Sequence, residues 1–492
     1  MTSEIERCEV DVLVVGGGCS GAAAAWQASR MGASTLVAEP TPWLGGMITA
    51  AGVSAIDGNE GALGGGLFGR FRAAIEAHYG GAANVRTGWV SNTCFEPQVA
   101  AAWLAREVGR SGARVVHGAE LEAVLRTGDR IDGARFRCGD RSLEVRARVT
   151  IEATEYGDVL AHGDVPFRLG REARTETGEP DAPAAADLEL QDITMVATLR
   201  RHDGAARPVP RPADHDPGLF DCAVADRCST PDPELLNHAL HDWASFLGYG
   251  LLPNGLFMLN WPFHSNDHPA LGLFGTAAER AATIAAARRR TLAFVHFMQH
   301  DLAHPEWGLA ADVYPTADGL PLIPYVRECR RVIAVRDFRE QDVVPAAGAE
   351  RPPLLADGIA VGDYYLDHHH STEHLPPDRR LGECYPKNAP FQVPYSALVP
   401  RMVDGLLCAE KSIGSTHIVN GCARLQPVAM LIGQAAGAAA ALAAAAGVEP
   451  RVVDVRALQH HLLAEGCQIV PDRSTPPNAP EFAARQLKLL GG

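Results

Sequence analysis

The sequence predicts an α/β protein in which both ends of the chain build one parallel sheet covered by helices, with an α+β domain inserted between them. Residues 10–39 read as a strand, a glycine turn, a helix and a second strand. Residues 405–446 return to the same order of strand, glycine-containing loop and small-residue helix. Residues 188–390 differ, because they combine strand-like runs with turns rich in aromatic residues and histidine. This alternation of strands and helices at the two ends is typical of a doubly wound sheet.

The opening stretch places a glycine motif between a strand and a helix. Residues 12–15 form a short apolar run, as expected for a parallel strand buried on both faces. Gly16, Gly18 and Gly21 follow with the spacing G-x-G-x-x-G, which in this context indicates dinucleotide binding. The first glycine makes the turn, the second lets backbone approach a pyrophosphate, and the third lets the helix lie close to the strand. The helix amino terminus then faces the diphosphate with free N–H groups, as in a Rossmann-like unit.

An acidic residue ends the second strand of this unit. Glu39 lies about 20 residues after the first glycine, where a carboxylate can bind the hydroxyls of an adenosine ribose. An acid there argues against a 2'-phosphate. The alternative is a glycine-rich turn in an ordinary α/β domain, and strand, spacing and acid together argue against it. A second G-x-G-x-x-G match at 64–69 has no strand before it, so we interpret it as a loop that enters a helix over 67–78.

The elements that follow alternate between helix and strand. Gly45 and Gly46, before Met47, form a doublet that can bring a second loop against the cofactor's phosphates; a plain turn is the alternative. Periodicity predicts helices over 67–78 and 96–111, and strands over 114–117, 120–127, 130–138 and 147–153. Residues 168–187, rich in glycine, proline and charge, are predicted to be an exposed loop at a domain boundary. Beyond it we expect a strand over 193–200 and a helix over 277–302.

The C-terminal block supplies a second half to the dinucleotide domain. A buried strand over 405–409 precedes a small-residue helix over 426–446, and a closing helix over 454–464 has Asp454 as its N-cap. A helix amino terminus near Gln426 and Val428 suits the pyrimidine end of a flavin. FAD needs both of its ends held, which favours FAD over NAD. We therefore expect a divided cofactor domain at 8–165 and 391–450, an inserted substrate domain at 166–390, and a C-terminal helix and tail at 451–492.

Composition limits the partners and the compartment. The chain has 492 residues, ordinary globular hydrophobicity and a net charge of -15, which disfavours nucleic acid and anionic membranes. The charged N-terminus does not resemble a signal peptide, and the apolar run over 427–448 is mostly alanine and glycine, which favours a close-packed buried helix. Eleven cysteines without CxxC pairs fit reduced thiols and give no zinc or iron-sulfur signature. We expect a soluble cytoplasmic protein, with self-association into a homo-oligomer left open.

Several segments of the chain resemble a known family. The C-terminal ones are FQVPYSALVP at 391–400, GLLCAEKSIGSTH at 405–417 and RLQPVAMLIGQAAG at 424–437. They are similar to the bacterial FAD-dependent oxidoreductases of the glutathione-reductase-like superfamily, in particular to a group of which some members carry the name xanthan lyase. The segments EATEYGD at 152–158, YVRECRR at 325–331 and LQHHLLAEG at 458–466 resemble other recurrent parts of that group. The resemblance covers about residues 8–467, with 168–311 matched poorly.

The resemblance implies which residues hold the cofactor. The helix after Arg424, which begins near Gln426 and Val428, would face the flavin. The chain departs from the group in one place, because Glu410 and Lys411 stand where many relatives carry Gly-Arg. The residues implied to hold the ADP half and the ribityl chain are Gly16, Gly18, Gly21, Glu39, Gly45, Gly46 and Met47.

A flavin dehydrogenase needs a base for the proton and cations that orient the substrate. His417 is a candidate base or orienter and Arg424 a candidate anion clamp; the alternatives are a structural histidine and a phosphate or backbone anchor. Tyr325 and Arg327 are further candidates, although Arg327 and Glu328 also suit a buried ion pair that ties domains together.

Three consecutive histidines, 368–370, suggest a metal site at first sight. On a strand they point to alternating faces, and no spaced acidic or cysteine partner is evident, so we predict no metal. One of them at the substrate pocket fits better.

The sequence predicts an FAD enzyme that dehydrogenates or oxidises a small polar metabolite by hydride transfer to flavin N5. The absence of a second nucleotide motif mildly disfavours NAD(P)H as reductant. Two alternatives remain open: a non-redox flavoenzyme, such as a lyase, hydratase or isomerase, and a flavin-binding module without catalysis.

Overall fold

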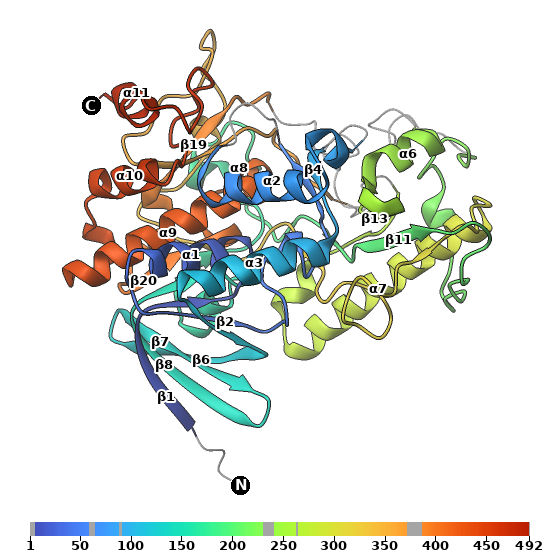
Figure 1. The fold of residues 1–492 in the computed structure, drawn as a ribbon, viewed down its shortest axis with the longest axis horizontal. Coiled ribbons are helices and arrows are strands. Elements are labelled where there is room, and N and C mark those ends of the chain that lie inside the picture. Colours follow the sequence, from blue (N-terminus) through green and yellow to red (C-terminus); the bar gives the residue numbers. More distant parts are fainter. Residues whose placement is uncertain are drawn as a thin grey trace.

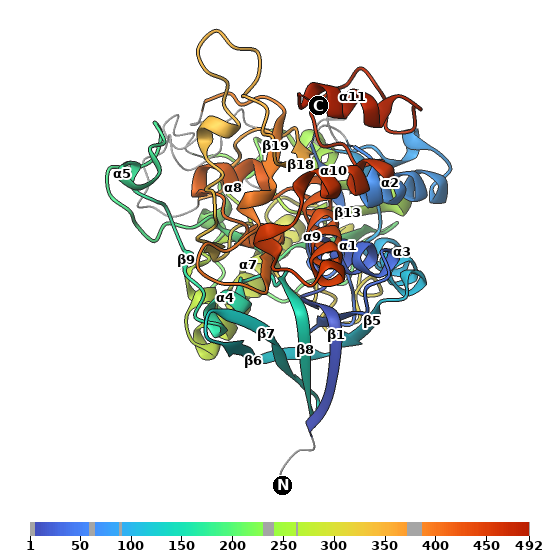
Figure 2. The ribbon, with the colours of Figure 1, turned by 90° about the vertical axis from the view of Figure 1, so that its left-hand side faces the viewer.

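The computed structural model describes residues 5–58, 64–87, 91–229, 241–261, 264–370 and 386–491. Its main feature is a seven-stranded sheet in the order β5-β2-β1-β8-β7-β6, with β20 paired to β8 (Figures 1 and 2). The strands are β1 (Ile5–Val15), β2 (Thr35–Glu39), β5 (Arg114–His117), β6 (Ala119–Thr127), β7 (Arg130–Cys138), β8 (Arg141–Glu152) and β20 (Leu406–Cys408).

Strand β8 has two different sets of neighbours. Its first half pairs antiparallel with β7, from Cys138 opposite Arg141 to Gly133 opposite Arg146. Its second half pairs parallel with β20, which comes from the far end of the chain. Strands β1, β2 and β5 extend the parallel part on the other side. The predicted Rossmann-like parallel core is therefore confirmed, and the C-terminal segment completes it.

The buried strand β1 contributes side chains to both faces of the sheet. Val12 and Val14 pack into the larger core with the helices, while Leu13 and Val15 pack into a second core on the opposite face. Because successive side chains of a strand alternate, an uninterrupted apolar run fits only a strand covered on both sides. This is the pattern that residues 12–15 show in the sequence.

Helices α1 (Cys19–Arg30) and α9 (Gln426–Ala446) lie side by side on one face of the sheet (Figures 1 and 2). A Cβ atom at Gly433 would collide with the backbone of Ser20, and one at Gly437 with the backbone of Ala24. The glycines thus permit the close contact between the two helices. Helix α9 is also the one helix in the described ranges that is long and apolar enough to span a membrane, with a mean hydropathy of 1.8, and 89% of that window is buried. The predicted close-packed buried helix is confirmed.

The middle of the chain forms smaller antiparallel sheets beside the long helix α7 (Ala277–His300), which Figure 1 shows in yellow-green. One sheet has the order β14-β10-β16 and another the order β12-β13-β11-β15. Their strands are β10 (Ile193–Thr194), β11 (Ala197–Arg201), β12 (Leu251–Leu252), β13 (Leu256–Leu259), β14 (Asp267–His268), β15 (Trp307–Leu309) and β16 (Tyr325–Val326). The predicted strand over 193–200 is thus divided between two sheets.

Most predicted elements are present with small shifts of their ends. The exception is β8, which begins six residues before the predicted 147, because its first half is partly exposed and lacks a continuous apolar run. The other helices are α2 (Gly66–His78), α3 (Pro97–Ser111), α4 (Asp158–His162), α5 (Arg174–Thr177), α6 (Trp243–Gly250), α8 (His417–Ala423), α10 (Val455–Ala464) and α11 (Phe482–Leu489). The remaining strands are β3 (Ala55–Asp57), β4 (Ser91–Cys94), β9 (Phe167–Arg168), β17 (Arg331–Val332), β18 (Gly358–Gly362) and β19 (Phe391–Pro394).

The prediction that residues 168–187 form an exposed loop is wrong in part. Glu172 and Glu179 are buried, and both reach the start of α8. The Glu172 carboxylate accepts a hydrogen bond from the backbone N–H of His417 at 3.0 Å, and the Glu179 carboxylate accepts one from the hydroxyl of Thr416 at 2.6 Å. The charged composition suggested exposure, whereas these charges have buried partners far away in the sequence.

The expectation of reduced cysteines is also wrong for one pair. Cys222 and Cys228 form a disulfide across a short loop, with their Cα atoms 4.1 Å apart. The spacing of six residues does not match a CxxC pattern, so this pairing has no local signal in the sequence. Cys384 lies outside the described residues. The free cysteines of the described part are Cys8, Cys19, Cys94, Cys138, Cys329, Cys408, Cys422 and Cys467.

Candidate cofactor and substrate site

The glycine turn between β1 and α1 is closely packed. Gly16 has φ +92°, a left-handed conformation that suits glycine, and a Cβ there would collide with the carbonyl of Ala153 at the end of β8. A Cβ at Gly21 would collide with the carbonyl oxygen of Gly16. A Cβ at Gly18 would lie 2.8 Å from Oε1 of Glu410, a side-chain atom. The first and third glycines therefore serve packing, while the second faces a carboxylate.

Glu39 lies beside this turn, at the carboxyl end of β2. Its carboxylate accepts hydrogen bonds from the backbone N–H of Gly17 at 2.7 Å and of Thr41 at 2.8 Å. Burial raises its pKa to about 7, against the effect of these hydrogen bonds. The acid is thus placed at the ends of the strands, where ligands of open α/β sheets bind.

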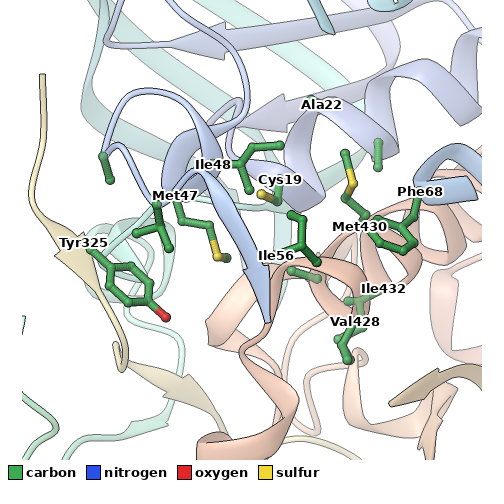
Figure 3. Packing of buried hydrophobic residues seen from close by; sticks show 14 of the residues in the cluster. Cys19, Ala22, Met47, Ile48, Ile56, Phe68, Tyr325, Val428, Met430 and Ile432 are labelled. Carbon is green, nitrogen blue, oxygen red and sulfur yellow. The ribbon is translucent and has the colours of Figure 1, made fainter. Parts of the chain in front are cut away.

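The glycine doublet brings a second loop to the first. The backbone N–H of Gly45 donates to the carbonyl of Gly17 at 2.8 Å, and both Gly45 and Gly46 have positive φ. The doublet leads into a short 3₁₀ helix, η1 (Gly46–Ile48). Met47 in this helix is buried in the core cluster that also contains Cys19, Tyr325 and Val428 (Figure 3).

The amino terminus of α1 holds a carboxylate of the chain itself. The backbone N–H groups of Cys19 and Ser20 donate to the two oxygens of Glu410, each at 3.2 Å, and the Ser20 hydroxyl donates to it at 2.7 Å. Lys411 Nζ lies 2.7 Å from Glu155 and 3.8 Å from Glu410. Glu410 and Lys411, which stand where many relatives carry Gly-Arg, therefore lie at the position predicted for the diphosphate of the cofactor.

The start of α9 is tied to β3. The side chain of Gln426 accepts a hydrogen bond from the backbone N–H of Asp57 at 3.3 Å and donates one to the carbonyl of Ala55 at 3.2 Å. Val428 is buried in the first turn. The amino end of α9, Met47 and the α1 turn thus border one region of the molecule (Figure 3).

Three predicted substrate residues come together around the ring of Tyr325. The guanidinium of Arg327 lies 4.7 Å from the ring centroid and that of Arg424 lies 5.9 Å from it. Arg424 also donates a hydrogen bond to the Tyr325 hydroxyl. Both arginines are almost completely buried. Such cation–π contacts hold the guanidinium groups in fixed positions.

Two aspartates and a histidine link the arginines. Asp367 accepts from Arg424 at 2.9 Å, and Asp267 lies 3.3 Å from Arg327. His369 connects them, with Nδ1 2.9 Å from Asp267 and Nε2 3.3 Å from Asp367. The two carboxylates raise the pKa of His369 despite its burial. Burial opposes ionisation of Asp267, but Arg327 and His369 outweigh it and lower its pKa to about 2.

Asp57 completes this group, which we call the arginine cluster. Burial, and next the neighbouring charge of Asp367, raise the pKa of Asp57 to about 7, against the influence of Arg424. Asp57 is half-buried, and Tyr365 nearby is 50% exposed, so the group is connected to the surface. An acid with this pKa can exchange a proton near neutral pH. The arginine cluster consists of Asp57, Asp267, Tyr325, Arg327, Asp367, His369 and Arg424.

His417 is not part of the arginine cluster. Its Nδ1 lies 3.0 Å from the fully buried carboxylate of Glu328, and its ring stacks with His368 and His370 at centroid distances of 4.9 and 5.4 Å. Burial, followed by the charge of Arg331, lowers its pKa well below the usual value. We call Glu172, Glu328, Arg331, His368, His370 and His417 the histidine cluster. Glu328 and Arg327 are neighbours in the chain and yet have different partners, His417 for Glu328 and Asp267 for Arg327.

The three consecutive histidines are divided between the two clusters. His368 and His370 stack parallel at 6.0 Å, while His369 contacts the aspartates on the other side. Within the described ranges, no group of three His, Cys, Asp or Glu side chains is arranged to hold a metal ion. One histidine at the substrate pocket was predicted from the sequence, whereas Asp57, Asp267 and Asp367 were not predicted. These aspartates come from three distant segments, and the one local signal is the acid at the end of β3.

The sequence matches the family model described as FAD dependent oxidoreductase over residues 11–462. The chain belongs to the FAD dependent oxidoreductase family. It is therefore an FAD-dependent oxidoreductase, and its cofactor is FAD. No curated protein matches the sequence.

Several solved structures are similar to this oxidoreductase. A geranylgeranyl bacteriochlorophyll reductase-like protein from Thermoplasma acidophilum is 14% identical, with 99% of this chain and 88% of that chain covered and a TM-score of 0.39. An anhydrotetracycline hydroxylase from Streptomyces rimosus is 12% identical, with 98% of this chain and 72% of that chain covered and a TM-score of 0.38. L-proline dehydrogenase from P. horikoshii is 21% identical, with a TM-score of 0.20, and the match covers 31% of this chain and 24% of that one. At these TM-scores the likenesses carry no argument about function.

The residues at the strand ends fit FAD. A helix amino terminus that already binds a carboxylate can bind a diphosphate, since both are anions. Glu39 lies beside the glycine turn for a ribose, and the amino end of α9 offers N–H groups without a side-chain cap. Glu410 must release the backbone N–H groups of Cys19 and Ser20 before a diphosphate can bind them.

Proposed function

We propose that this FAD-dependent oxidoreductase dehydrogenates or oxidises a small polar metabolite that carries an anionic group. The observation that carries the proposal is the arginine cluster, in which two buried guanidiniums surround Tyr325 next to the half-buried Asp57. When Asp57 is ionised and can act as the base, Arg327, Arg424 and His369 are matched by three acids, because the pKa of His369 is raised and those of Asp267 and Asp367 are lowered. The preference for an anion such as a carboxylate therefore rests on the two guanidiniums, which can bind it through charge-assisted hydrogen bonds.

The residues of the chain then have separate tasks. Arg327 and Arg424 bind the anionic group and fix the orientation of the substrate, since Tyr325 and the aspartates hold both guanidiniums in place. When bound, FAD supplies the acceptor at N5 for the hydride that leaves the substrate carbon. Asp57 accepts the proton from the neighbouring O–H or N–H group of the substrate, so that one hydride and one proton leave together.

We propose further features that the sequence suggested. The interruption of the parallel sheet by the β6–β7 hairpin and its completion by β20 support a glutathione-reductase type of FAD domain, made from 8–165 and 391–450, with 166–390 as an inserted substrate domain. The net charge of -15 supports a chain without nucleic-acid or membrane partners, and the burial of α9 supports a soluble one. The eight free cysteines of the described residues support a cytoplasmic location, and the Cys222–Cys228 disulfide argues against it. A homo-oligomer is compatible with this proposal.

An anaerobic visible spectrum tests the reaction. FAD-loaded protein is mixed with pools of 2-hydroxy acids, of amino acids and of their amide analogues, which lack the carboxylate. We expect bleaching of the flavin band by one acidic pool and by none of the amides. Turnover without bleaching would favour a lyase, hydratase or isomerase, and neither turnover nor bleaching with any metabolite pool would favour a flavin-binding module. Arg200 forms an exposed pair with Asp312 at 2.8 Å. Arg200→Lys is therefore a matched control for arginine-to-lysine substitutions in the arginine cluster, because it leaves the site unchanged.

A further inference from the structure

Glu410 occupies a position that its backbone does not favour. It begins the short helix η10 (Glu410–Ser412), separated by one residue from the end of β20, and its φ of +54° lies in the left-handed region that L side chains rarely adopt. Such a conformation persists where surrounding contacts hold the residue. Here the contacts are those of the carboxylate with the amides of Cys19 and Ser20 and with the Ser20 hydroxyl. A glycine would suit the backbone better, so the side chain accounts for the presence of glutamate.

The surroundings of the Glu410 carboxylate disfavour a further negative charge, because two carboxylates already share one ammonium group. Lys411 is completely buried and contacts both Glu155 and Glu410. One oxygen of Glu155 is buried without a partner among the described residues, and it lies beside the space above Gly18. A diphosphate at the α1 amino terminus would add its charge to these two carboxylates and one ammonium. It would also require the same N–H groups that Glu410 now engages.

We propose that Glu410 is a resident anion that caps α1 in the flavin-free protein and gives up the amides of Cys19 and Ser20 to the diphosphate of FAD. Lys411 is the counter-ion in both states. The proposal rests on FAD as the cofactor and is independent of the substrate reaction. By linkage, a contact that stabilises only the flavin-free form lowers the affinity for FAD by the same factor.

The test uses the full chain freed of flavin, with Glu410→Gln and Glu410→Gly. The first variant removes the charge, and the second also relieves the left-handed backbone. We expect the affinity for FAD, measured from quenching of its fluorescence, to rise by about two- to thirtyfold, which corresponds to the loss of one helix cap. The flavin-free Glu410→Gln variant should melt at a lower temperature. ADP, which carries the diphosphate without the flavin, should gain affinity equally, whereas riboflavin, which lacks phosphate, should not.

Asp454→Asn is the matched control. Asp454 caps α10 through the amides of Arg456 at 2.9 Å and Ala457 at 3.3 Å, away from the glycine turn. Its loss should lower the melting temperature of the flavin-free and FAD-loaded forms alike and leave FAD affinity unchanged. Weaker FAD binding by both Glu410 variants would overturn the proposal, since Glu410 would then be a cofactor ligand. Unchanged affinity for FAD and ADP would overturn it as well. If Glu410→Gln does not fold, Glu410→Gly decides between the same outcomes.

Discussion

The arginine cluster and the histidine cluster are built from the same segment, 325–331, and yet differ in what they can do. Arg327 pairs with Asp267 in the cluster that also contains Asp57, a half-buried acid whose pKa is raised to about 7. Glu328 is completely buried and pairs with Arg331 and with His417, whose pKa is lowered well below its usual value. Both clusters combine arginine, acid and histidine. We therefore propose that access to solvent and a proton-exchanging group, rather than residue type, make the arginine cluster the reactive one of the two.

The largest effect should come from Asp57→Asn. Because the asparagine cannot accept the proton, we expect the rate of flavin reduction to fall by about 10²–10⁴-fold. In the unsubstituted protein the carboxylate is ionised above its pKa, so the rate should rise with pH, level off above about pH 7, and fall tenfold per unit below it. The variant should lose this dependence. Stopped-flow bleaching across a pH series measures both. An unchanged profile would remove Asp57 from the reaction.

The next effect concerns the histidine cluster. Arg331→Met leaves the buried carboxylates of Glu172, at 2.6 Å, and Glu328, at 3.1 Å, without their cation. Removing one partner of a buried ion pair costs about 3–5 kcal/mol of unfolding free energy. Thermal unfolding of the FAD-loaded protein should show a markedly lower melting temperature. Arg200→Met, which breaks an exposed pair worth about 0–1 kcal/mol, is the control. Equal melting temperatures of the two variants would contradict a structural role for Arg331.

The smallest effect on the reaction should come from His417→Asn. The asparagine side chain retains a hydrogen-bond donor near Glu328, and it loses the ring that stacks with His368. We expect the bleaching rate to change by less than about tenfold. Loss of a group that acts as a general acid or base would lower the rate by about 10²-fold or more. Steady-state and single-turnover rates measure this. A loss of 10² or more would restore His417 as the base and bring the two clusters into one site.

Parts of the fold could be predicted because their signals are local. The apolar run of β1, the glycines of the α1 turn and the small residues of α9 each specify a close approach within one element or its neighbour. The burial of Glu172 and Glu179 could not be predicted in this way. It depends on contacts such as Glu172 with Arg331, which are far apart in the sequence.

The candidate site likewise contains residues that could be predicted from the sequence and residues that could not. Tyr325, Arg327 and Arg424 were predicted from segments that resemble a family, and the structure brings them together. Asp57 and Asp367 belong to no motif, since Asp57 is a single acid at the end of the short strand β3 and Asp367 lies in an irregular segment. Asp367 raises the pKa of Asp57, and Arg424 influences the pKa of both, only when folding brings these distant residues together. Sequence therefore indicated the cations of the site and missed the acids that set its charge.

The most direct test of the account compares one conservative substitution in each cluster, Arg424→Lys and Arg331→Lys, by anaerobic titration of flavin bleaching with the active metabolite pool. Arg424→Lys should raise the half-saturating concentration of the metabolite by about tenfold or more, because a lysine cannot replace a bidentate guanidinium. The same substitution should change the melting temperature only slightly. Arg331→Lys should lower the melting temperature and leave the half-saturating concentration unchanged. The opposite assignment, with saturation altered only by Arg331→Lys, would contradict the arginine cluster as the substrate site.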